Sequence, residues 1–175
     1  MKESFRGEYY QKVDAKARML IPVPFRRLLD RGDEKTPETP RTRIVIVYGG
    51  GRARQYCEVY PMDVSEVLAT KIRRMQPGSE KRKSLELEFF KRSATVEIDD
   101  DGRIVVPPQV REKLGITGDD MKSGAEVVLA GIGSRLGLWG AGLYRGSHAP
   151  PPPGGGGRGL SQALGGLPLD DDLEF

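Results

Sequence analysis

The chain has almost none of the residues that build metal sites, disulfides or nucleophilic dyads. Its 175 residues include one cysteine, Cys57, and one histidine, His148. Cys57 lies in an apolar stretch and His148 in a Gly/Pro-rich one, so a Cys/His metal cluster, a disulfide framework and a Cys–His dyad are excluded. No credible nucleophile–base pair remains. We therefore expect no cofactor and no enzymatic activity.

The chain also lacks long apolar runs and a strong charge of one sign. No run approaches the roughly 20 apolar residues that a helix needs to cross a bilayer. The first eleven residues lack the apolar core of a secretory signal. We expect a cytoplasmic protein without a membrane partner. The net charge of +3 permits a nucleic-acid partner without requiring one.

The last fifth of the chain is poor in residues that build a folded core. Residues 140–175 hold 10 of the 23 glycines and 5 of the 13 prolines, and they contain no β-branched residue. Such a composition cannot bury enough apolar surface to offset its conformational entropy. We therefore predict a disordered tail over residues 140–175.

The preceding body contains an internal repeat. Residues 13–29 align with residues 98–114 at a constant offset of 85, and five of these seventeen columns are identical. About one identity is expected by chance at average residue usage. The identical pairs are Asp14/Asp99, Arg18/Arg103, Pro22/Pro107, Arg26/Arg111 and Leu29/Leu114. The sequence thus predicts two related units, residues 5–61 and 90–139, joined by connecting helices at residues 62–89.

Each unit predicts the same series of local structures. An extended run, at residues 9–13 or 94–98, leads into a polar turn, and three apolar residues then form a buried strand. Pro22 or Pro107 ends that strand and begins a helix, because proline lacks the ladder N–H and suits the first helical turn. Two more strands follow in each unit, at residues 43–48 and 56–60 and at residues 126–130 and 136–139.

Helices are predicted between the units. Residues 63–66 resemble a capping box and begin an apolar stripe at helical spacing, and Pro77-Gly78 separates this helix from a second one that starts near Leu85. Short strands dominate the rest of the body. The predicted fold class is therefore mostly β with helical caps (α+β).

The repeated polar turn is the candidate functional element. Asp14 and Asp99 each precede an arginine by four residues, Arg18 and Arg103. A turn-opening Asp accepts hydrogen bonds from backbone N–H groups two residues on, and a small residue at the fourth position allows a positive φ. The arginine can then grip a phosphate or the O6/N7 edge of guanine. Alternatively, Asp and Arg only pair within each turn, which contributes about 0–1 kcal/mol when exposed.

These motifs, in this order, resemble MraZ, a family of bacterial transcriptional regulators built from two SpoVT-AbrB-type units. The resemblance covers residues 5–139. It rests on FRGEY at residues 5–9, VDxKxRxLIPxxFR at residues 13–26, Tyr60-Pro61, and EIDxxGRIxxPxxxR at residues 97–111. Together these motifs are specific, whereas one Asp-x-x-x-Arg turn would be weak evidence.

The resemblance implies a tandem swapped-hairpin SpoVT-AbrB-like β-barrel, with a pseudo-two-fold from the internal duplication. It also implies a ring-like homo-oligomer that binds G-rich direct repeats in double-stranded DNA, upstream of the bacterial division and cell-wall gene cluster. We expect a nucleoid-associated regulator, most simply a repressor. The family's DNA contacts lie in the turns, and the DNA-binding residues expected here are Lys12, Asp14, Lys16, Arg18, Asp99 and Arg103.

Three features depart from the family pattern. Ala17 replaces the glycine that is usual in the first turn. Residues 12–18 sum to a charge of +2 and residues 97–103 to −3, so we expect the first turn to supply most of the phosphate attraction. The last strand contains Gly137, which weakens a strand. Because that strand leads into the Gly/Pro-rich tail, we predict an altered, for example frame-shifted, terminus from about Leu136.

A second interpretation stays open. A protein-binding module of the same fold, antitoxin-like or a scaffold, would keep the duplicated barrel and use its tail or helices for a protein ligand. A disordered tail is compatible with this interpretation, whereas the duplicated arginine turns favour DNA.

Overall fold

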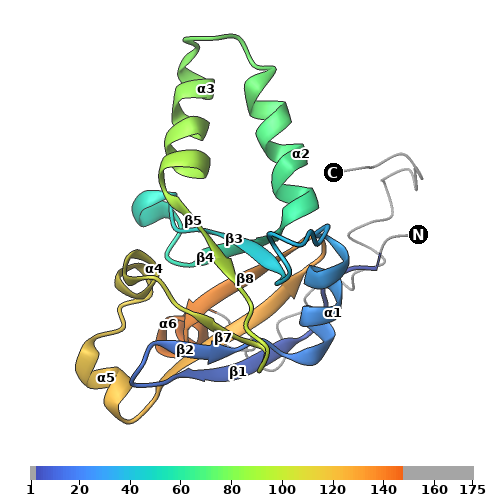
Figure 1. Ribbon diagram of the computed structural model, residues 1–175. Helices are drawn as coiled ribbons and strands as arrows, with labels where there is room; N and C mark the ends of the chain where they lie inside the picture. Colours follow the sequence, from blue (N-terminus) through green and yellow to red (C-terminus); the bar gives the residue numbers. More distant parts are fainter. Residues whose placement is uncertain (1–2, 148–175) are drawn as a thin grey trace, which may run out of the picture.

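The computed structural model describes residues 3–147 (Figure 1). The first unit contains β1 (Glu8–Val13), β2 (Arg18–Leu20), α1 (Val23–Arg31), β3 (Arg43–Val47), the 3₁₀ turn η1 (Gly51–Ala53) and β4 (Cys57–Pro61). The connection contains α2 (Met62–Arg73), α3 (Glu80–Leu85) and the π-helical turn η2 (Glu86–Lys91). The second unit contains β5 (Ser93–Glu97), β6 (Arg103–Val105), α4 (Pro108–Lys113), α5 (Gly118–Lys122), β7 (Ala125–Ile132), β8 (Arg135–Gly140) and α6 (Ala141–Ser147). The predicted α+β class and the predicted strands are confirmed, each strand within two residues of its expected bounds.

Six strands form one antiparallel sheet in the order β1-β7-β8-β4-β3-β5, and β2 pairs with β6 in a separate two-stranded ribbon. The closed barrel that the resemblance implies is therefore wrong for the described residues, because β1 and β5 are opposite edges of an open sheet. The chain leaves the ladder at the turns after β1 and β5. The three-residue strands β2 and β6 then pair with each other and do not close the sheet.

The two units share their strands. β1 of the first unit pairs with β7 of the second, and β5 of the second unit pairs with β3 of the first. In the middle of the sheet β4 pairs with β8, with Cys57 opposite Leu138. The strand order is therefore symmetric: each strand of one unit has the equivalent neighbours to those of the corresponding strand of the other unit. Neither unit therefore has a complete sheet of its own.

The main core lies between the sheet and the helices that follow the turns. Leu29 and Leu114, which occupy the same column of the repeat, are both buried. Phe25 of the first unit is buried beside them in the same core. The rings of Phe5 and Tyr9 meet Phe25 edge-on, with centroids 5.9 and 5.0 Å away. Such edge-to-face pairs add about 0.5–1.5 kcal/mol beyond area burial. The packing fixes β1 against α1 and so positions the first turn.

Helices α2 and α3 extend from one side of the sheet as a pair of arms (Figure 1). α2 begins directly after its N-cap residue Pro61, which makes no side-chain cap bond, so the predicted capping box at residues 63–66 is wrong. Asp63 Oδ1 instead accepts a hydrogen bond from the backbone N–H of Val64 at 2.8 Å. Ser79 caps α3 by accepting a hydrogen bond from the backbone N–H of Arg82 at 3.3 Å. Across residues 3–147, the structure contains no helix that is both long and apolar enough to span a bilayer.

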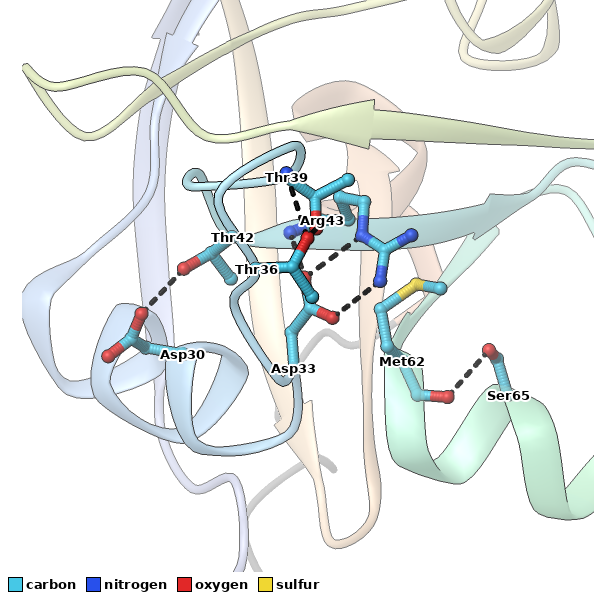
Figure 2. A network of polar contacts seen from close by, with 8 residues as sticks. All are labelled: Asp30, Asp33, Thr36, Thr39, Thr42, Arg43, Met62 and Ser65. Carbon is cyan, nitrogen blue, oxygen red and sulfur yellow. Dashed lines mark hydrogen bonds and ion pairs between the residues drawn. The ribbon is translucent and has the colours of Figure 1, made fainter.

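A network of polar contacts holds the connection from α1 to β3 (Figure 2). The buried carboxylate of Asp33 accepts hydrogen bonds from the backbone N–H and Nε of Arg43, at 2.8 and 3.1 Å. Burial opposes the ionisation of Asp33, but the hydrogen bonds from Arg43 outweigh it and keep the pKa of Asp33 below its ordinary value. Thr42 Oγ1 donates to Asp30 at 2.6 Å. The carbonyl of Thr42 accepts a hydrogen bond from the backbone N–H of Ile98 at 2.8 Å, which places this connection beside the second turn.

The end of the described chain is ordered. Leu136 and Leu138 of β8 are fully buried, and Gly137 is required there because a Cβ would lie 2.2 Å from the ring of Trp139. Helix α6 follows and buries Tyr144 beside the same ring. The predicted start of the tail at residue 140 is therefore wrong for residues 140–147. The rest of the predicted tail, residues 148–175, lies outside the described residues.

Candidate nucleic-acid interface

The first turn is braced by the carboxylate of Asp14. Its Oδ1 accepts hydrogen bonds from the backbone N–H groups of Lys16 at 2.9 Å and Arg18 at 2.8 Å. Its Oδ2 accepts from Nε of Arg18 at 3.0 Å. These bonds, led by the backbone N–H of Arg18, lower the pKa of Asp14 below its ordinary value. The predicted role of Asp14 in fixing the loop is confirmed, and the carboxylate is ionised at neutral pH.

The second turn has the same backbone arrangement. Asp99 Oδ1 accepts from the N–H groups of Asp101 and Arg103, both at 2.9 Å. These bonds, chiefly the one from Arg103, lower the pKa of Asp99. The backbone N–H of Asp14 donates to Arg18 O at 3.0 Å, and that of Asp99 donates to Arg103 O at 2.8 Å. The two turns therefore match bond for bond along the backbone.

The fourth residue of each turn has the positive φ that the sequence predicts. Ala17 has φ 61° and Gly102 has φ 79°. At Gly102 a Cβ would lie 2.2 Å from a terminal nitrogen of Arg26, whose guanidinium covers this turn. Glycine is thus favoured at residue 102 by its conformation, and a Cβ there would also displace the flexible side chain of Arg26. Ala17 is buried and carries the strain of a left-handed conformation.

Backbone bonds cross between the turns and place them side by side. Ile21 N–H donates to Gly102 O at 2.9 Å, and Val106 N–H donates to Ala17 O at 2.7 Å. The two bonds are equivalent in the internal repeat, because Ile21 corresponds to Val106 and Gly102 corresponds to Ala17. The β2–β6 ribbon between them sets Arg18 opposite Val105 and Arg103 opposite Leu20. One ribbon therefore holds both arginines of the repeat.

Most of the predicted DNA-binding residues come together in one shallow hollow of about 360 Å³. The predicted residues in its lining are Lys12, Asp14, Arg18 and Arg103. Lys16 and Asp99 lie in the adjoining turns outside this lining. The other lining residues, which the sequence did not single out, are Tyr10, Gln11, Leu20 and Glu126.

The two arginines differ in their partners. Nε of Arg18 is bound to Asp14, and the side chain is 37% exposed. Its terminal nitrogens have no hydrogen-bond or ion-pair partner in residues 3–147. The guanidinium of Arg103 has no such partner anywhere in the described chain. Arg18 therefore offers a planar fork whose base is already oriented, which lowers the entropy cost of gripping an anion.

The acidic second turn has a basic neighbour that the sequence did not indicate. Arg41 lies 3.5 Å from the carboxylate of Asp100, and both side chains are well exposed. Arg26, Arg27 and Lys35 line the same shallow surface as Asp99 and Asp100. Basic groups from the first unit thus offset part of the negative charge of the second turn.

The buried strand predicted from three consecutive apolar residues is wrong in one respect. Met19 and Ile104 are 1% exposed, but Leu20 is 40% and Val105 is 60% exposed. Only one face of the ribbon packs on the core, and side chains alternate between the two faces of a strand. Leu20 and Val105 therefore lie on the outer face together with Arg18 and Arg103.

The described residues contain no group of three or more His, Cys, Asp and Glu side chains that could hold a metal ion. Burial raises the pKa of Cys57 to about 12, so this thiol stays protonated at neutral pH.

Comparison with known proteins places the sequence among transcriptional regulators. It is 46% identical over 144 residues to "Transcriptional regulator MraZ" of Cereibacter sphaeroides strain KD131, covering 82% of this chain and 84% of the relative. The chain belongs to the MraZ family. It is 40% identical over 116 residues to the MraZ of Ruegeria sp. strain TM1040, covering 66% and 69% of the two chains. The MraZ of Desulfitobacterium hafniense strain DSM 10664 is 28% identical over 141 residues, covering 80% and 83%.

A family model described as "MraZ protein, putative antitoxin-like" matches residues 89–146. This match spans the second unit from the end of η2 to α6. It includes β8, so the prediction of an altered terminus from about Leu136 is wrong for residues 136–146. The predicted resemblance to MraZ is confirmed.

Proposed function

We propose that this MraZ-family protein is a sequence-specific DNA-binding transcriptional regulator that acts as a repressor. The observation that carries the proposal is the β2–β6 ribbon, in which two braced turns bring Arg18 and Arg103 to one outer face. An arginine fork can bind the O6/N7 edge of guanine bidentately, and a two-stranded ribbon fits the major groove. The proposed ligand is therefore double-stranded DNA with G-rich direct repeats, upstream of the division and cell-wall gene cluster.

Multivalency is part of the proposal. One arginine–guanine contact discriminates by only about 1–3 kcal/mol, so a single subunit grips its site weakly. Several subunits of a ring-like homo-oligomer that engage neighbouring repeats together raise the effective concentration of each turn. Binding at a promoter then excludes the transcription machinery. The proposed location is the cytoplasm, at the nucleoid, and the proposal assigns no catalysis to the chain.

A gel-shift with DNA from immediately upstream of the gene's own operon tests the function. We expect binding that weakens steeply with added salt, because phosphate contacts release counterions. A fragment with one repeat should bind far more weakly than tandem repeats, and mutation of the guanines should abolish the shift. Equal affinity for one repeat and for the tandem array would contradict the multivalent mechanism. No shift on any upstream fragment would contradict the DNA-binding function.

A protein-binding function is the second candidate, and one observation favours it. An apolar groove of about 430 Å³ lies between the arms and the sheet, lined among others by Tyr60, Leu68, Ile72, Leu85 and Phe89. The antitoxin-like description of the family model is consistent with a protein ligand. Purification of the chain from its native cells would decide between them. A stoichiometric protein partner without nucleic acid would favour this second function.

A further inference from the structure

The outer face of the β2–β6 ribbon carries two exposed aliphatic side chains that the grip on guanine and phosphate does not use. Leu20 is 40% and Val105 is 60% exposed, although the preceding residues Met19 and Ile104 are each 1% exposed. Isolated exposed aliphatic residues are common on protein surfaces. These two, however, occupy the same column of the internal repeat, since residue 20 plus the offset of 85 is residue 105. An exposed aliphatic side chain is thus present in both copies.

The register of the ribbon places each aliphatic side chain directly across from an arginine. Arg18 is opposite Val105, and Leu20 is opposite Arg103. Directly opposite residues on one face of an antiparallel pair have Cβ atoms about 4.5–5.5 Å apart. On the outer face, basic and aliphatic groups therefore alternate along each strand and across each opposite pair, with the two arginines on one diagonal and the two aliphatic residues on the other. Met19 and Ile104 point to the core and hold this face in place.

We infer that Leu20 and Val105 are specificity-determining residues that contact thymine methyl groups next to the guanines bound by the arginines. This inference rests on the proposed DNA-binding function. The C5-methyl of thymine is the apolar group that base pairs present in the major groove, where aliphatic side chains recognise it. An arginine beside an aliphatic residue can then read a guanine beside a thymine. Lys12, in the same hollow, supplies attraction for the phosphates on either side.

The pairing of one arginine with one aliphatic residue on each strand gives the inference a geometric consequence. Each half of the ribbon contributes one arginine and one aliphatic side chain, and the halves are related by the internal repeat. The thymine preference should therefore occur at two positions of the bound site, one dependent on Leu20 and the other on Val105.

The test replaces thymine by deoxyuridine, which removes only the methyl group and leaves every hydrogen-bonding group of the base in place. Each thymine of the bound repeats is replaced in turn, and the affinity of the full chain is measured at constant salt. We expect a loss of about fourfold for each contacted methyl, the value of one buried CH₂ group. In Leu20→Ala and Val105→Ala, one position each should lose its sensitivity to deoxyuridine. Leu87→Ala, which truncates a 53% exposed leucine in η2, is the matched control and should keep the wild-type pattern.

Other outcomes would overturn the inference without touching the proposed function. If no thymine is sensitive, or if the sensitivity is identical in the wild type and both ribbon variants, the aliphatic side chains do not read the base. If either ribbon variant changes the mass of the assembly in light scattering, this face contacts a second copy of the chain instead. The salt dependence of binding should be unchanged in Leu20→Ala and Val105→Ala, because neither residue contacts phosphate. Failure of the proposed function itself would appear as the absence of a shift on any upstream fragment. Unaltered operator binding by Arg18→Ala and Arg103→Ala would instead show that the ribbon is not the DNA contact.

Discussion

The two turns of the repeat share their backbone arrangement and their Asp and Arg residues, and they differ in net charge and in the partner of the arginine. Asp14 and Asp99 accept the same pair of backbone N–H groups, at distances that agree within 0.1 Å. The first turn carries +2 over residues 12–18 and the second −3 over residues 97–103. The first orients its arginine through an ion pair, and the second leaves Arg103 without a partner among the described residues.

The matching hydrogen bonds and the unequal charges show that the loop shape and the charge of these turns vary independently. The loop shape depends on an acceptor at the first position and a positive φ at the fourth, and both copies retain these two features. The charge depends on surface side chains and is unequal in the two copies. Arg41 from the first unit restores part of the balance at the second turn. We therefore expect similar turn geometry and unequal contributions to DNA binding.

The largest expected effect is the loss of Arg18. Arg18→Ala removes an oriented fork from every subunit and should lower operator affinity about 10- to 100-fold, the value of one bidentate guanine contact. Arg103→Ala should cost less, because its acidic turn attracts phosphate less strongly. Fluorescence anisotropy at fixed salt measures both, with Arg73→Ala on α2 as the control that removes an exposed arginine elsewhere. An equal or larger loss at Arg103 would contradict the asymmetry.

The next effect concerns stability at the fourth position of the second turn. Gly102→Ala should lower the free energy of unfolding by about 1–3 kcal/mol, because it adds a strained φ to a clash with Arg26. Gly78→Ala is a matched control with the same φ of 79° and no atom within 4 Å of the added Cβ. Urea denaturation measures both variants. If Gly102→Ala costs no more than Gly78→Ala, the cover by Arg26 contributes nothing.

The reciprocal change in the first turn should have a smaller effect of opposite sign. Ala17→Gly relieves the positive φ, while the freer unfolded chain and the lost buried methyl offset part of the gain. We expect a rise in the free energy of unfolding of less than about 1 kcal/mol, with unchanged operator affinity. Urea denaturation and anisotropy measure the two quantities. A loss of stability would show that the buried methyl of Ala17 contributes more than its strain costs.

The smallest effect should come from the charge of the second turn. Asp101→Asn removes one negative charge and keeps the backbone N–H that binds Asp99. Operator affinity should rise about threefold at low salt, and the gain should vanish at high salt because such charges are screened. Asp119→Asn in α5 makes the same charge change away from the turns and serves as the control. A gain of equal size in the control would show a general effect of net charge and would remove the special role of the second turn.

Much of the local structure could be predicted from particular residues. Pro22 and Pro107 directly precede α1 and α4, as expected of residues that end a strand and begin a helix. The positive φ at Ala17 and Gly102 follows from small residues in an Asp-opened turn. By contrast, the predicted capping box on α2 is wrong, because Pro61 in β4 is followed at once by the helix. The disorder predicted from composition is also wrong at α6, because Tyr144 packs beside Trp139 and the glycine-rich segment forms a helix.

The sequence by itself determined the turns, because an Asp acceptor, a small fourth residue and an arginine act on one another within five residues. Only the tertiary structure decided that Lys12, Arg18 and Arg103 meet in one hollow, that the sheet stays open, and that Leu20 and Val105 face outward. Those outcomes depend on pairings between residues more than 80 positions apart and on which face of the ribbon the core covers. A run of three apolar residues carries no information about the covered face, because alternation becomes visible only when one neighbour is polar.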